Sequence, residues 1–253
     1  MKRQNLRSGL LLVSLLLLPV TIYFFSPLAA VKGAMAGVVS ASLLFYGFLF
    51  LGSIFAGRAF CGWIMPCGAL QEFCAQANPR PARGGWRNRI KYLTSASLAG
   101  ALVFLLYRAG GIKGLDPLRD TENGVWLTGP QRFMIYFGVT GTMVTAALIF
   151  GRRAFCHYLC VMAPIMIAGR TLRNMLRLPS LQLERTTEGC VACGRCNQAC
   201  PMSIDVKQAV RTGNLESAEC ILCGRCADSC PQKVLKLAFG VPRHPQKAPN
   251  PGA

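Results

Sequence analysis

Cys190-Val-Ala-Cys193-Gly-Arg-Cys196-Asn-Gln-Ala-Cys200-Pro201 and Cys220-Ile-Leu-Cys223-Gly-Arg-Cys226-Ala-Asp-Ser-Cys230-Pro231 are two stretches with one cysteine spacing. In the pattern C-x2-C-x2-C-x3-C-P, three thiolates surround one 4Fe-4S cube and the fourth binds the neighbouring cube. Zinc sites or disulfides would not require this pattern twice. The sequence therefore predicts two clusters, one held by Cys190, Cys193, Cys196 and Cys230, and the other by Cys220, Cys223, Cys226 and Cys200.

The composition indicates a membrane protein. Of the 253 residues, 52% are hydrophobic and only 15% are charged, with a net charge of +18. Nineteen of the 28 Lys and Arg residues precede residue 184, where only four acids occur, and many flank apolar runs. The excess charge therefore belongs to a membrane part of the chain, and we expect membrane lipid and no nucleic acid as a partner.

Four apolar runs, without Asp, Glu, Lys or Arg, cover about residues 9–25, 34–56, 92–107 and 133–150. They predict an all-α membrane domain of four transmembrane helices, in two hairpins, over residues 1–161. The first run also resembles a signal peptide, but an internal repeat favours its retention. After it we expect an amphipathic surface connector at 162–183, a small α+β domain with two 4Fe-4S clusters at 184–240, and a disordered tail at 241–253.

The orientation follows from the basic residues near the ends of the runs. Lys2, Arg3 and Arg7 precede the first run, and further arginines follow the second and fourth runs. Positive residues concentrate on the cytoplasmic side. We therefore predict a multi-pass protein of a bacterial or archaeal inner membrane, with both termini and the cluster domain in the cytoplasm. That reducing compartment also suits thiolate ligands.

A short repeat supports the two hairpins. The tetrapeptide Arg-Ala-Phe-Cys occurs at residues 58–61, after the second run, and at 153–156, after the fourth. The matching positions suggest two copies packed about a pseudo-two-fold axis.

A second group of cysteines follows these tetrapeptides. Its members are Cys61, Cys67, Cys156 and Cys160, with Cys74 as a fifth. If the hairpins pack together, the thiols could converge, since soft thiolates suit iron-sulfur, zinc or copper(I). Three interpretations stay open: an additional metal or cluster site, a redox-active dithiol, or small buried residues. His157 is interpreted as a hydrogen-bonded interfacial histidine in preference to a residue that contacts a quinone or tunes a cluster.

Together, the stretches Cys61-Gly-Trp-Ile-Met-Pro-Cys67-Gly-Ala-Leu-Gln-Glu72 and Cys156-His-Tyr-Leu-Cys160, the apolar runs and the cysteine-rich tail resemble the NapH/NosR-like family of membrane-bound polyferredoxins. In that family, C-x3-C-P motifs lie at the cytoplasmic ends of transmembrane helices. The sequence departs from this pattern at Met65, which replaces a cysteine, and at Val161, which replaces a proline.

The resemblance implies an electron-transfer subunit, such as a quinol dehydrogenase component, that links the quinone pool or a membrane redox partner to a partner oxidoreductase. An alternative is an accessory reductant or redox sensor for metalloenzyme maturation, without direct quinone chemistry. The sequence has no C-x-x-C-H and only two histidines, and it has no G-x-G-x-x-G that opens a helix after a strand. No haem or flavin is therefore predicted.

Overall fold

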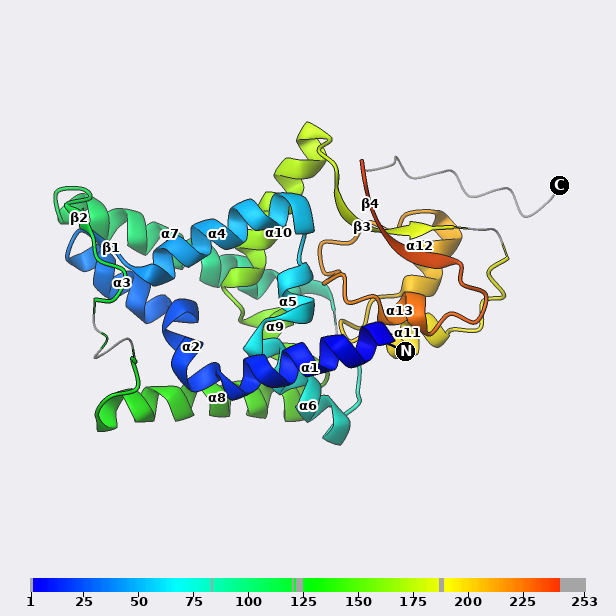
Figure 1. Cartoon of the computed structure of the whole chain (residues 1–253), viewed down its shortest axis with the longest axis horizontal. Helices are drawn as coiled ribbons and strands as arrows, with labels where there is room; N and C mark the ends of the chain where they lie inside the picture. Colours follow the sequence, from blue (N-terminus) through cyan, green and yellow to red (C-terminus); the bar gives the residue numbers. More distant parts are fainter. Residues whose placement is uncertain (1, 83, 120, 122–124, 187–188, 242–253) are drawn as a thin grey trace.

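The structure is a computed structural model that describes residues 2–82, 84–119, 121, 125–186 and 189–241. Long helices lie roughly along one axis, and a small domain with strands lies at one end of them (Figure 1). Residues 242–253, which hold nearly all of the predicted disordered tail, lie outside the described residues.

The first apolar run forms two helices instead of one. These are α1 (Lys2–Leu16) and α2 (Leu18–Phe25), which meet at an angle of 85°. Pro19 lies in the first turn of α2. Proline lacks the backbone N–H and clashes with the carbonyl of the preceding turn, so a helix cannot pass straight through it. The apolar run at 9–25 therefore forms part of one candidate span that is broken at this bend.

The second run, residues 34–56, is also interrupted. Helix α3 (Pro27–Met35) ends inside it, and α4 (Ala41–Ala56) begins after strand β1 (Val38–Val39). This strand pairs in parallel with β2 (Gly114–Leu115). The extended backbone at 38–39 therefore belongs to a small sheet, and α4 is left as an apolar helix of 16 residues.

Two helices match the third and fourth runs. They are α7 (Ile90–Arg108), which continues the 3-10 turn η1 (Gly85–Arg89), and α8 (Pro130–Phe150). Both are long and apolar enough to cross a membrane, and the bent pair α1–α2 would be a third such span. The described part of the chain thus has two or three candidate spans, consistent with a membrane protein, instead of the predicted four.

Helices α4 and α8 are each followed by a short helix and a longer one. The first pair is α5 (Ala59–Trp63) and α6 (Pro66–Ala77), and the second is α9 (Ala154–Tyr158) and α10 (Met162–Leu176). Helix α10 packs closely on α4, because a Cβ atom at Gly169 would lie 2.0 Å from Ser53 Oγ and 2.5 Å from Phe50 O. Arg170 and Arg173 on α10 are buried. This helix is therefore part of the core, which differs from the amphipathic surface connector expected at 162–183.

The end domain has the expected small α+β architecture. Strand β3 (Ser180–Arg185) pairs antiparallel with β4 (Leu235–Gly240), in a register that runs from Ser180 opposite Gly240 to Arg185 opposite Leu235. Among the described residues between them lie three short helices, α11 (Arg195–Ala199), α12 (Val206–Thr212) and α13 (Arg225–Asp228). Strand β3 starts at Ser180, so this domain begins inside the predicted connector.

Candidate functional site

The two cysteine motifs of the end domain have left-handed residues at matching positions. In the first motif Ala192 (φ 53°) and Gly194 (φ 74°) adopt left-handed conformations, and in the second Leu222 (φ 50°) and Gly224 (φ 73°) do so at the matching positions. Non-glycine residues seldom adopt this conformation, and they do so where the surroundings require it. Alternating right- and left-handed residues turn successive N–H groups toward one point and form an anion-binding concavity. The backbone thus suits a negatively charged cluster in each motif.

The structure brings the eight cysteines together in two sets of four, each set around one cavity. Cys200, Cys220, Cys223 and Cys226 line one cavity, which we name the inner site. Cys190, Cys193, Cys196 and Cys230 line another, which we name the outer site. These are the sets expected from the spacing, in which the fourth cysteine of each motif serves the other cluster. Their occupation by clusters stays a prediction.

The two sites differ in burial. At the inner site Cys200, Cys223 and Cys226 are buried, whereas at the outer site Cys190 and Cys193 are exposed. Val191, between the exposed pair, is 62% exposed. The outer site therefore faces solvent, and the inner site lies toward the helices.

The repeated Arg-Ala-Phe-Cys segments have equivalent structures. In the first, the Phe60 carbonyl accepts hydrogen bonds from the N–H groups of Ile64 (3.0 Å) and Met65 (3.0 Å). In the second, the Phe155 carbonyl accepts them from Leu159 (2.9 Å) and Cys160 (3.0 Å). Met65 therefore occupies the position of Cys160, and the first turn of α6 supplies Cys67 instead.

The thiols of Cys61, Cys67, Cys156 and Cys160 are all buried, and we name this group the helix-end site. Gln71 fixes one side of it, because its Nε2 donates to Cys156 Sγ at 3.2 Å and its Oε1 accepts from the Phe155 N–H at 3.0 Å. Cys74 lies seven residues beyond Cys67 on α6, about 10 Å along the helix axis. Cys74 is also buried, but at this separation it lies apart from Cys67.

Two buried arginines lie beside the helix-end site. Burial raises the pKa of the Cys61, Cys67 and Cys160 thiols, that of Cys160 to about 12, while Arg58 and Arg153 oppose the increase at Cys61. Arg58 Nε and Nη2 and Arg153 Nε are buried and have no hydrogen-bond partner among the described residues. Unsatisfied buried donors are costly. An anionic group with several acceptor atoms, such as an iron-sulfur cluster, would fit next to them.

The helix-end site contacts the inner site through the first repeat. Gly62 lies so close to the second cysteine motif that a Cβ atom there would be 2.3 Å from Ile221 O and 3.5 Å from Cys223 Cβ. Trp63 Nε1 donates to the Leu222 carbonyl at 3.1 Å. The residues that follow Cys61 therefore pack directly on the loop of the inner site.

The second repeat makes a matching contact. His157, at the position equivalent to Gly62, places Nε2 3.1 Å from the Met202 carbonyl, two residues after Cys200. Its Nδ1 is buried without a hydrogen-bond partner among the described residues. Burial lowers the pKa of His157 to about 4, so the ring is neutral at neutral pH. His157 is hydrogen-bonded, as the sequence interpretation favoured, but it is buried between two cysteine motifs.

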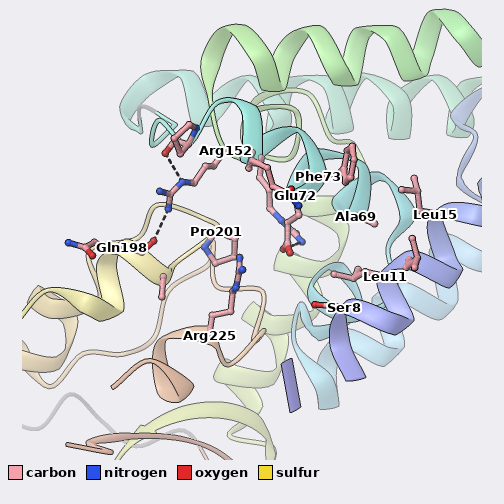
Figure 2. A pocket seen from close by; sticks show the side chains of 16 residues that line it. Ser8, Leu11, Leu15, Ala69, Glu72, Phe73, Arg152, Gln198, Pro201 and Arg225 are labelled. Atoms are coloured by element: carbon pink, nitrogen blue, oxygen red, sulfur yellow. Dashed lines mark hydrogen bonds and ion pairs between the residues drawn. The ribbon is translucent and has the colours of Figure 1, made fainter. Parts of the chain in front are cut away.

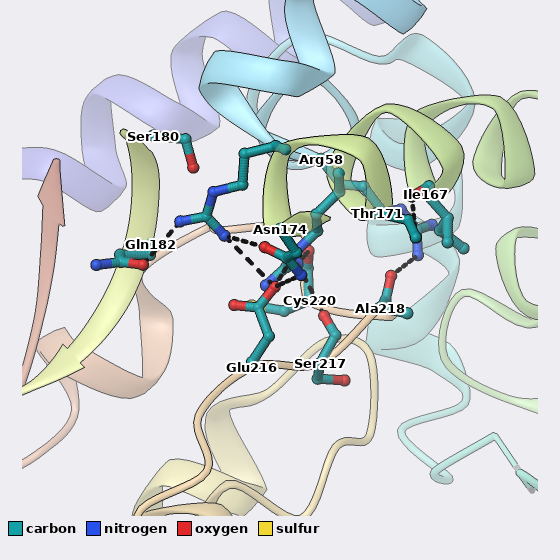
Figure 3. Close-up of polar contacts among 12 residues, drawn as sticks. Arg58, Ile167, Thr171, Asn174, Ser180, Gln182, Glu216, Ser217, Ala218 and Cys220 are labelled. Carbon is teal, nitrogen blue, oxygen red and sulfur yellow. Dashed lines mark hydrogen bonds and ion pairs between the residues drawn. The ribbon is translucent and has the colours of Figure 1, made fainter. Parts of the chain in front are cut away.

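Ion pairs across the domain boundary were not expected from the sequence. Arg58 Nη1 donates to Glu219 Oε2 at 3.1 Å, next to Cys220, and Lys91 also pairs with Glu219. A second group lies on α10, where Arg170 Nε donates to Glu216 Oε1 at 2.6 Å. Figure 3 shows Glu216 beside Asn174, whose Nδ2 donates to the same oxygen at 3.1 Å. The sequence did contain one indication of these pairs. Its 10 Asp and Glu residues are far outnumbered by 28 Lys and Arg residues, so a carboxylate near a cysteine motif has several cations with which it can pair.

In the part of the chain that the structure describes, no three Cys, His, Asp or Glu side chains stand close enough to hold a single metal ion. The cysteines described above instead line cavities or cluster in the core.

Comparisons with known proteins agree with these sites. Residues 189–235 match the model of a 4Fe-4S dicluster domain, and residues 39–91 and 131–162 match that of a 4Fe-4S binding domain. The second match includes all four cysteines of the helix-end site. No solved structure matches the chain.

One curated relative adds a functional description. The chain is 25% identical, over 200 residues, to the putative electron transport protein YccM of Escherichia coli strain K12. The match covers 74% of this chain and 53% of YccM, so the chain spans about half the length of that relative. Fold, cysteine sites and family matches together define a protein with 4Fe-4S ferredoxin-type domains.

Proposed function

We propose that this chain is a membrane-bound polyferredoxin of the NapH/NosR-like type, which relays electrons between the quinone pool and a partner oxidoreductase. The observation that carries the proposal is the contact of Gly62 with the Ile221 backbone. It brings the cysteine segment at the helix ends against the loop that carries Cys220 and Cys223. A soluble ferredoxin domain that was merely tethered to the membrane would not need so close a contact.

The order of the three cysteine sites supports a relay. The helix-end site lies in the core beside the candidate spans, the inner site is buried next to it, and the outer site is exposed. Electrons would then have a buried route from the membrane side to a surface where a soluble or membrane-bound partner docks. The direction of flow depends on the potentials of donor and acceptor.

The inner and outer sites would each hold one 4Fe-4S cluster through the four cysteines named above. Such clusters carry one electron each, and their potentials depend on hydrogen bonds to sulfur and on solvent exposure. The chain's own residues supply the difference in solvent exposure, because the inner site is buried and the outer site is open to water.

We further propose a third cluster at the helix-end site, held by Cys61, Cys67, Cys156 and Cys160. The match of residues 39–91 and 131–162 to a 4Fe-4S binding domain supports it. So do the unpartnered donors of Arg58 and Arg153. Cys74 is not part of this proposed ligand set.

The membrane placement is also a proposal. The bent pair α1–α2, the shorter apolar helix α4, and helices α7 and α8 would cross an inner membrane. This even number of crossings keeps both termini and the cluster domain on one side, the cytoplasmic side. Support comes from the many exposed apolar side chains on these helices, such as Phe104 (57% exposed), Phe137 (65%) and Ile149 (63%).

The test is to reduce the purified, reconstituted protein with menaquinol or ubiquinol and to follow the clusters by EPR. The proposal predicts cluster signals that a quinol generates and a quinone removes. If dithionite reduces the clusters but neither quinol does, direct quinone chemistry is rejected. If deletion then leaves a partner metalloenzyme without its metal, the accessory reductant is the better description.

A further inference from the structure

We propose that a cleft between α1, α6 and the cluster domain binds the head group of a quinone or quinol. This inference rests on the proposed function, because it locates the substrate of that relay. It concerns residues that the cysteine motifs do not include.

The cleft lies where the helices meet the cluster domain and has a volume of about 470 Å³, within the range of roughly 300–1,000 Å³ of small-molecule sites. Figure 2 shows Leu11 and Leu15 of α1 on one side, Glu72 and Phe73 of α6 on another, and Arg225 of the cluster domain opposite. One end of the cleft is therefore polar, and the wall formed by α1 is apolar.

Arg152 and Arg153 at the polar end already have partners. Arg152 donates from Nε to the Pro79 carbonyl at 2.7 Å and from Nη1 to the Gln198 carbonyl at 2.8 Å (Figure 2). Arg153 donates from Nη2 to Glu72 Oε1 at 2.5 Å. Arg7 also pairs with Glu72. Most of the positive charge here is thus engaged within the protein.

This arrangement favours a neutral head group over an anion. A phosphate would have to approach the Glu72 carboxylate, which lines the cleft and is itself held by two arginines. A quinol hydroxyl can donate a hydrogen bond to a carboxylate, and a quinone carbonyl can accept one from an arginine. Carboxylate and guanidinium groups side by side therefore suit both oxidation states of a quinone.

The apolar wall suits an isoprenoid tail. Leu12 of α1 is 58% exposed and Phe73 of α6 is 67% exposed, and both line the cleft. Helix α1 continues with further apolar residues toward the bend at Leu17. A membrane-dissolved ligand could thus keep its tail in lipid while its head group reaches the polar end.

The cleft also adjoins the proposed electron path. Ala199 and Pro201, on either side of Cys200, are among its lining residues. On the other side, Arg153 Nη1 donates to the Cys61 carbonyl at 3.0 Å. A head group in the cleft would therefore lie next to backbone segments of both the inner site and the helix-end site.

The experiment fills the cleft without disturbing the core. Leu12→Trp puts a larger side chain at the apolar wall, and Leu16→Trp is a matched control on the same helix, because Leu16 is 71% exposed and does not line the cleft. Both full-length proteins are titrated in detergent with a fluorescent quinone analogue, heptyl-hydroxyquinoline N-oxide, whose emission is quenched on binding. Ala75→Trp fills the cleft from α6 as a second variant.

We expect the cleft-filling variants to weaken analogue binding by about tenfold or more, which corresponds to roughly 1.4 kcal/mol. The control should bind as the wild type does, and all variants should keep the dithionite-reduced EPR signals. Binding that is unchanged in both Leu12→Trp and Ala75→Trp would overturn the proposal. So would displacement of the analogue by phosphatidylglycerol vesicles but not by a quinone, which would indicate a phosphate site.

The outcomes separate this inference from the proposed function. If quinol reduces the wild-type clusters and still does so at the same rate in Leu12→Trp, the relay stands and the cleft is not its substrate site. If the analogue binds in the cleft but no quinol reduces the wild-type clusters, the cleft stands as a quinone site and the relay fails.

Discussion

His157 donates from Nε2 to the backbone carbonyl of Met202 at 3.1 Å, and this hydrogen bond joins the second cysteine segment of the helical part to the loop that follows Cys200. Gly62 occupies the equivalent position in the first segment and contacts the other motif at Ile221. The first copy of the helical repeat thus contacts the loop that carries Cys220 and Cys223, and the second copy contacts the loop that follows Cys200. The internal symmetry of the helices has a matching symmetry in the cluster domain.

The His157 contact predicts the effect of replacing it. In His157→Phe the Met202 carbonyl would lose its donor in a buried place, which costs about 1–3 kcal/mol. We expect the inner cluster to be lost at a lower temperature, measured by visible absorbance and EPR on heating. His157→Gln can still donate and should recover much of this loss. Equal losses in both variants would show that the ring is needed only for packing.

Gly62 gives a second prediction. Gly62→Ala would place Cβ 2.3 Å from Ile221 O, so the backbone contact must open. We expect a less stable inner cluster and slower electron transfer from the membrane side, measured by rapid-freeze EPR. Gly52→Ala is the control, because no atom of the described residues beyond its chain neighbours and its own helix backbone lies within 4 Å of the position its Cβ would take, and alanine favours a helix. If Gly62→Ala transferred electrons to the inner cluster at the wild-type rate, the close contact between Gly62 and Ile221 would not matter for electron transfer.

Glu219 and Glu216 provide a matched pair at the domain boundary. Glu219 binds Arg58 and Lys91, both fully buried, whereas the Glu216 side chain is 38% exposed. Leaving buried cations unpaired in Glu219→Gln should destabilise the protein by about 3–5 kcal/mol. Glu216→Gln should cost less, because Glu216 is more exposed and its buried partners keep other acceptors, Arg170 the Ser217 carbonyl and Arg173 the Gln182 side chain. Thermal unfolding of both variants in the same detergent measures the difference, and a larger effect at Glu216 would be contrary to the structure.

The two clusters should differ in their resistance to oxidation. Cys190 and Cys193 are exposed, and Cys200, Cys223 and Cys226 are buried. Ferricyanide with a chelator should therefore remove the outer cluster first, releasing about half of the iron of a two-cluster domain in a fast phase. Cys193→Ser should abolish the fast phase and leave the slow one. Release of all iron in a single phase would mean that the two sites are equally accessible.

Cysteine spacing was enough to group the ferredoxin-type cysteines, because cluster geometry restricts which thiols can share a cube. The Arg-Ala-Phe-Cys repeat likewise indicated the equivalence of α5 and α9. Hydropathy did not locate the break at Pro19 or the strand at 38–39, since it counts apolar residues and not backbone hydrogen bonds. Glu72 and Gly62 were missed because their roles arise from contacts between distant segments, which no local pattern records.

The central claim is that electrons from a membrane quinol reach the outer site through the inner site. The most direct measurement is rapid-freeze EPR of the protein in liposomes after mixing with menaquinol, comparing wild type with Cys223→Ser. The relay predicts reduction of both clusters in the wild type and at least about tenfold slower reduction of the outer cluster in the variant, with that cluster still reducible by dithionite. Outer-cluster reduction at the wild-type rate without an inner cluster would contradict it.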